Sequence, residues 1–320
     1  MVIVDNLSRA GARANLAALK NLAEEKKFPL VFVHADVRNA HEIAAIIGKE
    51  RPEVIVHQAA QVAVTTSVEN PRLDFEINAL GTFNVLEAVR IHSPESYFIF
   101  ASTNKVYGGM EEVAVVEEAK RYRYRDLPAG VDESHGLDLH SPYGCSKGAA
   151  DQYVRDYHRI YGLRTVVFRQ SCIYGTHQYG IEDQGWIAWF VIASVLRRPI
   201  TVYGTGKQVR DVLWVDDLCE AYWRAWDKNV VGQIYNMGGG AENTLSLLEL
   251  LGVLKSQGFD DLTPKFSGIR PGDQPVYVAN AQRARRELDW IPSVAPRQGV
   301  HRLIDWVRAN RELVSSTLGF

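Results

Sequence analysis

Ser141-Pro-Tyr-Gly-Cys-Ser-Lys147 reads as the start of a helix that continues through residues 148–161. Ser141 suits the N-cap, because its hydroxyl can accept a hydrogen bond from a free backbone N–H of the first turn. Pro142 suits the first helical position, where its missing N–H is not needed. Gly162 is a typical residue for the C-terminal cap. The stretch therefore predicts a long, well-delimited helix in the middle of the chain.

Tyr143 and Lys147 lie four residues apart, so the predicted helix places both on one face. An ammonium beside a phenol favours phenolate and lowers the tyrosine pKa from about 10. Such a tyrosine can act as an acid or base near neutral pH. Because this spacing is also common on solvated helix faces, it indicates a site only if the rest of the chain supplies a hydride acceptor and a substrate pocket.

The composition predicts a globular protein with one large domain and one smaller one. The 320 residues are 46% hydrophobic and 23% charged, with a net charge of -2, which gives no electrostatic argument for nucleic acid. Cys145, Cys172 and Cys219 are odd in number and widely spaced, so we expect neither disulfides nor a metal site, and a cytoplasmic location. The longest apolar run, residues 186–196, is too short for a membrane span.

Apolar runs that read as buried strands alternate with helical stretches along the first half of the chain. Strands are expected at residues 1–4, 30–34, 54–57, 97–101 and 165–169, and helices at residues 12–26, 42–49 and 71–90. This alternation predicts an α/β fold with a Rossmann-like, doubly wound parallel sheet. Such sheets bind ligands beyond the carboxyl ends of their strands.

Several small or polar residues directly follow these strands and should share that rim of the sheet. They are Asp5, Asp36, Ala59, Ala60, Gln61, Ser102, Thr103 and Gln170. Beyond about Thr176 the pattern loosens into loops and shorter helices. We therefore expect a dinucleotide-binding domain over residues 1–175 and a smaller mixed substrate-binding domain over residues 176–320, with the chain returning to the first domain near residues 205–240.

One expected feature is missing from the first residues. A dinucleotide-binding fold normally opens with a strand and a glycine-rich turn that lets a pyrophosphate approach a helix N-terminus. This sequence opens at what reads as the second strand, whose terminal acid, Asp5, is expected to bind a ribose. Two explanations stay open: a first strand, glycine turn and helix that precede this sequence, or a real loss of cofactor binding.

With these elements placed, the chain resembles the extended short-chain dehydrogenase/reductase family of NAD-dependent nucleotide-sugar epimerases and dehydratases. The motifs that carry the resemblance, in the family's order, are Ser102-Thr-Asn-Lys-Val-Tyr-Gly108, the Ser141–Tyr153 segment, Arg210-Asp211 with Asp217, and Arg270-Pro-Gly-Asp273. The resemblance implies NAD as cofactor, a nucleotide-sugar substrate and a homodimer or homotetramer. Residues 5–9, 61–67 and 74–78 look most like the subgroup that epimerises CDP-linked sugars at C2.

The resemblance also implies roles in the reaction. Tyr143 would be the acid/base, Lys147 would lower its pKa and hold the nicotinamide ribose, and Thr103 would hydrogen-bond the reacting hydroxyl. Asn104 and Lys105 stand where dehydratases of the family carry two acids, so transient oxidation at C2 followed by return of the hydride is favoured over dehydration. A UDP-hexose 4-epimerase and a cofactor-deficient, non-catalytic relative remain as alternatives.

The expected contacts with NAD come from strand ends and from the tyrosine helix. They are Asp5, Asn6, Ser8, Arg9, Asp36, Val37, Ala59, Ala60, Gln61, Asn78, Ser102, Tyr143, Lys147 and Gln170. Asp5 would repel the extra phosphate of NADP, whereas Arg9 could accommodate it.

The expected contacts with the substrate combine cations for a diphosphate with residues around the sugar and the base. They are Thr103, Asn104, Cys172, His177, Gln184, Gln208, Arg210, Arg270 and Tyr277. Arg210 and Arg270 lead this set, because one guanidinium can bind two phosphate oxygens. His177 stands where the family often has arginine. His57, Trp186 and Trp189 are interpreted as core residues rather than ligand contacts.

Overall fold

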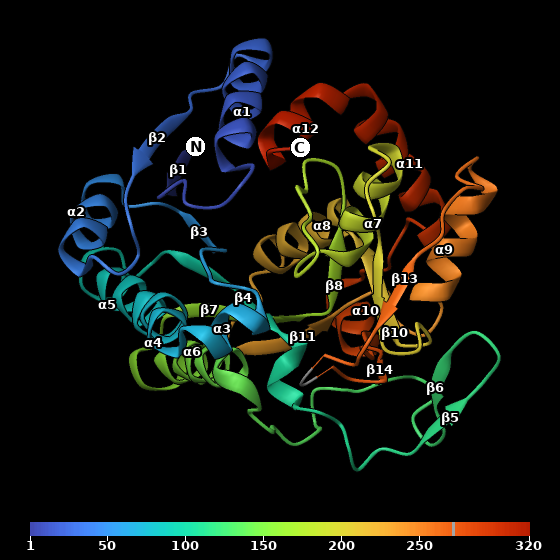
Figure 1. Ribbon diagram of the computed structural model, residues 1–320. Helices are drawn as coiled ribbons and strands as arrows, with labels where there is room; N and C mark the ends of the chain where they lie inside the picture. Colours follow the sequence, from blue (N-terminus) through green and yellow to red (C-terminus); the bar gives the residue numbers. More distant parts are fainter. Residues whose placement is uncertain (271–272) are drawn as a thin grey trace.

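Four parallel strands form the central sheet of the computed structural model, which describes residues 1–270 and 273–320 (Figure 1). Their order is β11-β7-β4-β3, with bounds Gln233–Met237, Arg164–Gln170, Tyr97–Thr103 and Val54–His57. All seven residues of β4 are buried, as expected for a parallel strand covered on both faces. The predicted strands at 54–57, 97–101 and 165–169 are thus confirmed.

Helices cover both faces of this sheet: α2 (Ala40–Glu50), α5 (Gly81–His92) and α6 (Ser141–Tyr161) on one, and α8 (Val215–Asp227) and α10 (Gln282–Leu288) on the other. The side chains of β4 alternate accordingly. Phe98 and Phe100 pack in the cluster with α5 and α6, whereas Tyr97 and Ile99 pack in the cluster with α8. Strand β11 and helix α8, which come late in the chain, are also part of this sheet and its packing.

A separate parallel ladder carries the N-terminal residues. Strands β1 (Val2–Asp5) and β2 (Val31–His34) pair with each other and are joined by α1 (Ala12–Lys26). No described strand links this ladder to β3 (Figure 1). Val2, Val31 and Val56 are consequently 37%, 46% and 47% exposed. The predicted doubly wound sheet is therefore present in two pieces, with unpaired backbone along the facing edges of β1 and β3.

The helix predicted over residues 71–90 contains an irregular turn. It consists of α4 (Pro71–Phe75), a π-helical turn (Glu76–Leu80) and α5. A π turn adds one residue to the helical circuit and is found most often at functional sites. Here it turns Asn78, which is fully buried, toward α6.

The tyrosine helix begins close to where the sequence predicts. His140 occupies the cap position of α6, but the capping hydrogen bond is made by Ser141, whose Oγ accepts from the Gly144 N–H at 3.2 Å. Gly162 ends the helix with a positive φ of 70° and donates to His158, as predicted.

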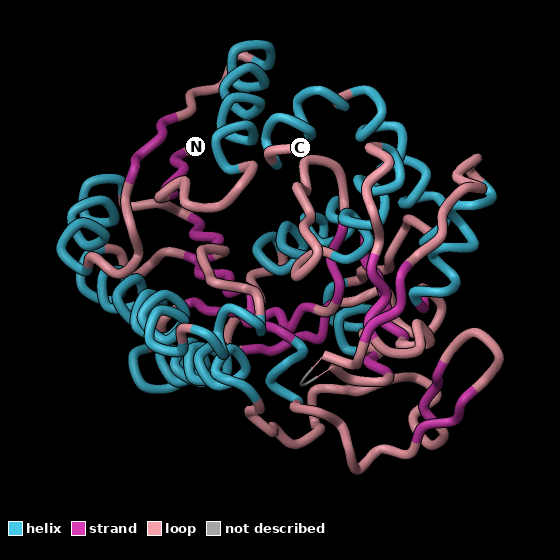
Figure 2. The backbone as a smooth tube through the Cα atoms, viewed as in Figure 1, coloured by secondary structure: helices cyan, strands magenta, loops and turns pink. Residues whose placement is uncertain are grey.

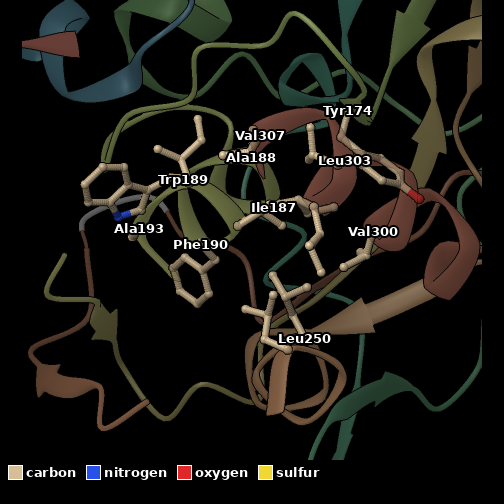
Figure 3. Close-up of a cluster of buried hydrophobic side chains, with 14 of the residues drawn as sticks. Tyr174, Ile187, Ala188, Trp189, Phe190, Ala193, Leu250, Val300, Leu303 and Val307 are labelled. Atoms are coloured by element: carbon tan, nitrogen blue, oxygen red, sulfur yellow. The ribbon is translucent and has the colours of Figure 1, made fainter. Parts of the chain in front are cut away.

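The second domain is built around a four-stranded sheet of short strands. Its elements are β8 (Cys172–Tyr174), β10 (Val209–Trp214), β12 (Thr244–Ser246) and β14 (Val276–Tyr277), with β9 (Thr201–Tyr203) and β13 (Lys265–Ser267) forming a further pair. Helices α7 (Trp186–Val195), α9 (Leu247–Ser256), α11 (Pro296–Ala309) and α12 (Arg311–Leu318) enclose its core. In that core Ile187, Phe190 and Leu303 lie close together (Figure 3).

Loops of the second domain lie near the sheet domain's strand ends. Residues 175–185 form a long loop between β8 and α7 (Figure 2). A hairpin of β5 (Val115–Glu117) and β6 (Tyr122–Tyr124) extends beside β14, and α3 (Val64–Glu69) follows β3. Among the described helices, none is both long enough and apolar enough to cross a bilayer.

Candidate active site

A cavity of about 1160 Å³ extends from the end of β1, past the ends of β4 and β7, to β10. Typical small-molecule pockets are roughly 300–1,000 Å³. The volume therefore has room for a large cofactor together with a substrate. The predicted site residues that line it are Asp5, Arg9, Ala60, Ser102, Thr103, Asn104, Tyr143, Lys147, Gln170, Cys172, His177, Gln184, Gln208, Arg210 and Arg270.

Thr103 and Tyr143 meet at the centre of this cavity. Thr103 ends β4, Tyr143 lies in the first turn of α6, and their hydroxyls are hydrogen bonded. Thr103 Oγ1 also accepts from the Lys105 backbone N–H at 3.2 Å, in the 3₁₀ turn Asn104–Tyr107 that follows β4. A substrate hydroxyl that reached this pair could donate to one oxygen and accept from the other.

Lys147 lies one turn further along α6, with Nζ 4.3 Å from the centre of the Phe100 ring. The pKa values differ from the sequence-based expectation. Burial raises the pKa of Tyr143 to about 12, although the hydrogen bond from Thr103 lowers it. Burial lowers the pKa of Lys147 to about 7, against the raising effect of Asp151 and Asp74. Burial of both groups thus outweighs the predicted depression of the tyrosine pKa by the lysine.

A hydrogen-bonded network fixes α6 against the π turn. Asn78 Nδ2 donates to Ser146 Oγ (3.1 Å) and to the Gln61 carbonyl (2.9 Å). Asp74 accepts from Ser146 (2.5 Å), from Gln61 Nε2 (2.7 Å) and from Asn78 (3.1 Å). Asn78 and Gln61 therefore hold the wall of the site from behind and do not line the cavity.

A second buried network lies behind Ser102. Asp151 of α6 forms an ion pair with Arg169 of β7 at 2.9 Å, with both side chains at most 2% exposed. Ser102 Oγ donates to the same carboxylate at 2.8 Å, and Arg169 also donates to Tyr107. Since charge-assisted contacts of this kind are directional, they fix α6, β4 and β7 relative to one another.

Two cationic groups lie on the far wall of the cavity. Arg210 of β10 pairs with Asp273 at 2.6 Å and donates to the Gln274 carbonyl at 2.8 Å. Arg270 lies 3.8 Å above the Tyr203 ring and pairs with Asp183 at 3.0 Å. The motif residues between Arg270 and Asp273, Pro271 and Gly272, lie outside the described residues.

The other predicted substrate contacts differ in placement. Gln208 donates to the Tyr203 carbonyl, and Cys172 accepts from the Trp186 indole N–H at 3.4 Å, so Trp186 reaches the cavity as well as the core. His177 packs on Trp306 at a centroid distance of 5.1 Å. Tyr277 is fully buried against Tyr107 and lies behind the cavity wall.

The ends of β1 and β2 form the remaining part of the site. Asp5 accepts from the Leu7 N–H at 2.6 Å, and Asn6 Nδ2 donates to Asp36 at 2.9 Å. Hydrogen bonds from Arg38 hold the pKa of Asp36 well below its usual range. Asn6, Ser8, Asp36, Val37 and Ala59 are outside the cavity lining, although Asn84 of α5 ties the Val37 carbonyl to the sheet domain at 3.0 Å.

Helix α1 contacts the second domain across the cavity. Gly11 has a φ of 89°, and a Cβ there would approach the Tyr179 ring to 2.3 Å, so only glycine permits this contact. Asn15 Nδ2 donates to the His177 carbonyl at 3.1 Å.

Sequence reasoning missed several residues that line the cavity. Tyr203, Asp183 and Glu182 support Arg270, and no local pattern in the sequence points to their role. Gln58 follows β3 directly, and its amide donates to Tyr222 at 2.8 Å, as Gln170 also does. His57 is a core residue as predicted, since it is buried and its Nε2 lies 3.0 Å from Thr82 Oγ1. Within the described residues, no group of three His, Cys, Asp or Glu side chains could hold a metal ion.

Comparison with known proteins connects this geometry to a family. The chain is 45% identical to CDP-paratose 2-epimerase of Salmonella typhi over 313 residues, which cover 96% of this chain and 91% of that protein. It is 32% identical to a putative UDP-glucose 4-epimerase of Methanocaldococcus jannaschii, over 87% of this chain and 84% of that one.

A solved structure shares the whole architecture. The dTDP-glucose 4,6-dehydratase DesIV of Streptomyces venezuelae, solved with NAD and TYD bound, superposes with a TM-score of 0.82 at 29% identity, over 99% of this chain and 89% of that one. Residues 1–303 match the protein family described as GDP-mannose 4,6 dehydratase. The chain therefore belongs to this family of NAD-dependent nucleotide-sugar epimerases and dehydratases.

Proposed function

We propose that this protein is an NAD-dependent nucleotide-sugar epimerase that inverts C2 of a CDP-linked sugar, as in the interconversion of CDP-paratose and CDP-tyvelose. The observation that carries the proposal is the hydrogen-bonded pair Thr103–Tyr143, followed on the 3₁₀ turn by Asn104 and Lys105 rather than by acids. An amide and an ammonium cannot take a carbon-bound proton as a dehydratase requires. The 45% identity to a CDP-paratose 2-epimerase supports the same substrate class.

In this mechanism Tyr143 takes the proton of the C2 hydroxyl and later returns it to the 2-keto oxygen. Thr103 donates to or accepts from the same oxygen as it changes between hydroxyl and ketone. When Lys147 is protonated, its positive charge favours the phenolate form of Tyr143. The sugar must present its opposite face between the two half-reactions, which the large cavity permits.

The residues around the cavity fit a dinucleotide in two places. Gln170 is the ladder partner of Thr103, and Lys147 follows Tyr143 by one turn of α6; both line the cavity. Asp5 lies at the β1 end of the cavity, where a carboxylate can accept from ribose hydroxyls. When bound, NAD supplies the acceptor and donor of the hydride. Arg210 and Arg270 would bind the diphosphate of the sugar nucleotide on the opposite wall.

A second copy of the chain is the expected partner. Tyr153, Ile160 and Tyr161 of α6 are 49%, 65% and 51% exposed, and Ile91 of α5 is 57% exposed. A homodimer or homotetramer that pairs these helices would bury them. Ile160→Glu should then give a monomer in light scattering, whereas Ile291→Glu, at a position of similar exposure elsewhere, should not.

Three free cysteines agree with a cytoplasmic location.

The decisive experiment is a panel of CDP-, UDP-, GDP- and dTDP-sugars incubated with the purified protein and NAD, with product stereochemistry followed by NMR. Inversion at C2 of a CDP-sugar, without net reduction or loss of water, is expected. The relative from Methanocaldococcus jannaschii favours a UDP-hexose 4-epimerase as second candidate. Inversion of UDP-galactose alone would favour that candidate, and absence of bound NAD(H) after denaturation would favour a non-catalytic relative.

A further inference from the structure

The backbone of Lys105 contacts Thr103, and its side chain reaches toward the cavity wall that carries Arg210. Its N–H donates to Thr103 Oγ1 at 3.2 Å, and its Nζ donates to Gln274 Oε1 at 3.3 Å. Gln274 is buried, and its own amide donates to the Gly108 carbonyl. The ammonium is therefore held in a defined place on the cavity lining.

The same glutamine brings a second cation alongside. The Gln274 carbonyl accepts from Arg210 at 2.8 Å, so Lys105 and Arg210 bind opposite ends of one residue. Burial first, and then the charge of Arg210, lower the pKa of Lys105 to about 8, against the raising effects of Asp273 and Cys172. Two neighbouring cations in a partly buried wall repel each other, and an anionic ligand between them would relieve that repulsion.

The position of Lys105 along the chain has a consequence for which carbon reacts. In a nucleotide sugar C1 carries the diphosphate, C2 is bonded to C1, and C4 lies across the ring. A reaction at C2 therefore brings the diphosphate close to the group that handles the reacting hydroxyl. Lys105 is two residues after Thr103, in the short turn that Thr103 caps, and its backbone N–H donates to the Thr103 hydroxyl.

We propose that Lys105 binds the diphosphate of the substrate together with Arg210 and thereby holds the sugar with C2, rather than C4, at Thr103 and Tyr143. This inference rests on the proposed function, since it assigns the residue that selects the carbon. Lys105 acts as a specificity-determining contact and does not transfer the proton.

The first test measures binding alone. Calorimetric titration of the wild-type protein with CDP, UDP, GDP and dTDP identifies the nucleoside diphosphate that binds most tightly. This diphosphate is the probe, and the monophosphate of the same nucleoside is titrated for comparison. Lys105→Met should weaken the diphosphate about 10- to 100-fold, as expected for a lost hydrogen bond between charged groups, and should change monophosphate binding much less. Lys105→Arg should restore most of the affinity. Lys207→Met is the control, since Lys207 pairs with Glu117 outside the cavity.

A pH titration covers the case in which Lys105→Met does not fold. Among the described residues, the groups that face Lys105 include Arg210, Asp273, Cys172 and the Gln274 amide. Wild-type affinity for the diphosphate should fall as the pH rises through about 8, whereas Lys105→Arg, which keeps the same neighbours and its own charge, should show no fall in that range.

The outcomes separate this inference from the proposed function. Equal diphosphate affinity in wild type and a folded Lys105→Met overturns the role of Lys105, whichever reaction the enzyme performs. Inversion at C4 by the wild type overturns both the proposed reaction and the selection of C2. Inversion at C2 together with diphosphate binding that depends on Lys105 supports both.

Discussion

The two strand ladders that end at the cavity differ in how firmly they are held. Strand β4 is buried along its whole length, and Ser102 at its end is tied to the Asp151–Arg169 pair. Strands β1 and β2 have no fully buried residue; exposed Asp5 at the end of β1 is held by a local turn, and half-buried Asp36 after β2 is held by Arg38. The residues proposed for proton transfer therefore lie on the firmly packed part of the molecule, and Asp5, proposed to bind the adenosine end of the cofactor, lies on the loosely packed part. Substitutions should therefore have large effects on the first and small ones on the second.

The largest effect is expected at Tyr143. Tyr143→Phe removes the acid/base but keeps the packing, so kcat should fall by roughly 10²- to 10⁴-fold while substrate and cofactor binding stay within a few-fold. Kinetics by NMR, with calorimetry for binding, test this. Tyr153→Phe, at an exposed position of the same helix, should be fully active. Activity retained by Tyr143→Phe would show that another group transfers the proton.

The next effect concerns stability rather than rate. Asp151→Asn leaves Arg169 buried with an uncompensated charge, so the free energy of unfolding should fall by about 3–5 kcal/mol. Urea denaturation measures it directly. Asp156→Asn, at an exposed position on α6, should change stability by less than about 0.5 kcal/mol. Equal stability of the two variants would mean that β4 and β7 are not held by this pair.

A pH-dependent effect on stability, of similar size, is expected at Lys147. Its pKa is about 7 in the folded protein and 10.5 ordinarily, so between these values the unfolded chain binds more protons and wild-type stability rises with pH. Lys147→Met removes this dependence. Its gain in stability over wild type should be greatest near pH 6 and shrink toward pH 10, as measured by urea denaturation across that range. Lys49→Met, at an exposed position, should show no such trend. A gain that did not vary with pH would place Lys147 in solvent.

The smallest effect is expected on the loosely held ladder. Asp5→Asn removes one charge from a largely exposed strand end, so NAD affinity should fall only about 3- to 10-fold, and discrimination against NADP should weaken. Fluorescence titration with both cofactors measures this, with Glu24→Gln on α1 as control. If Asp5→Asn instead lowered NAD affinity by roughly 10²-fold or more, the factor expected for kcat in Tyr143→Phe, the β1–β2 ladder would be as firmly organised as β4.

The parts of the fold that local patterns specify were predicted well. The apolar run of β3 and the helical spacing of α1 gave the observed bounds, because each depends on side chains within a few residues. The pairing of Thr103 with Tyr143 came from the resemblance to the family, and in the structure the end of β4 meets the first turn of α6.

Features that depend on distant residues could not be predicted. The π turn at Asn78 depends on Ser146 and Gln61, and the bridge from Lys105 to Arg210 depends on Gln274, far along the chain. The predicted lowering of the Tyr143 pKa was wrong, because the spacing of two residues reveals a neighbouring charge but not how deeply the pair is buried.

The facing edges of β1 and β3 have a consequence for how the protein opens. Among the described strands, each of these two uses only one of its edges for pairing, so the N–H groups on the other lack the protection of a ladder. We therefore expect the β1–α1–β2 unit to open as a cooperative segment before β4 and β7 do. In hydrogen–deuterium exchange, amides of residues 2–5 and 31–34 should therefore label together and early, and those of residues 97–103 should label only on global unfolding.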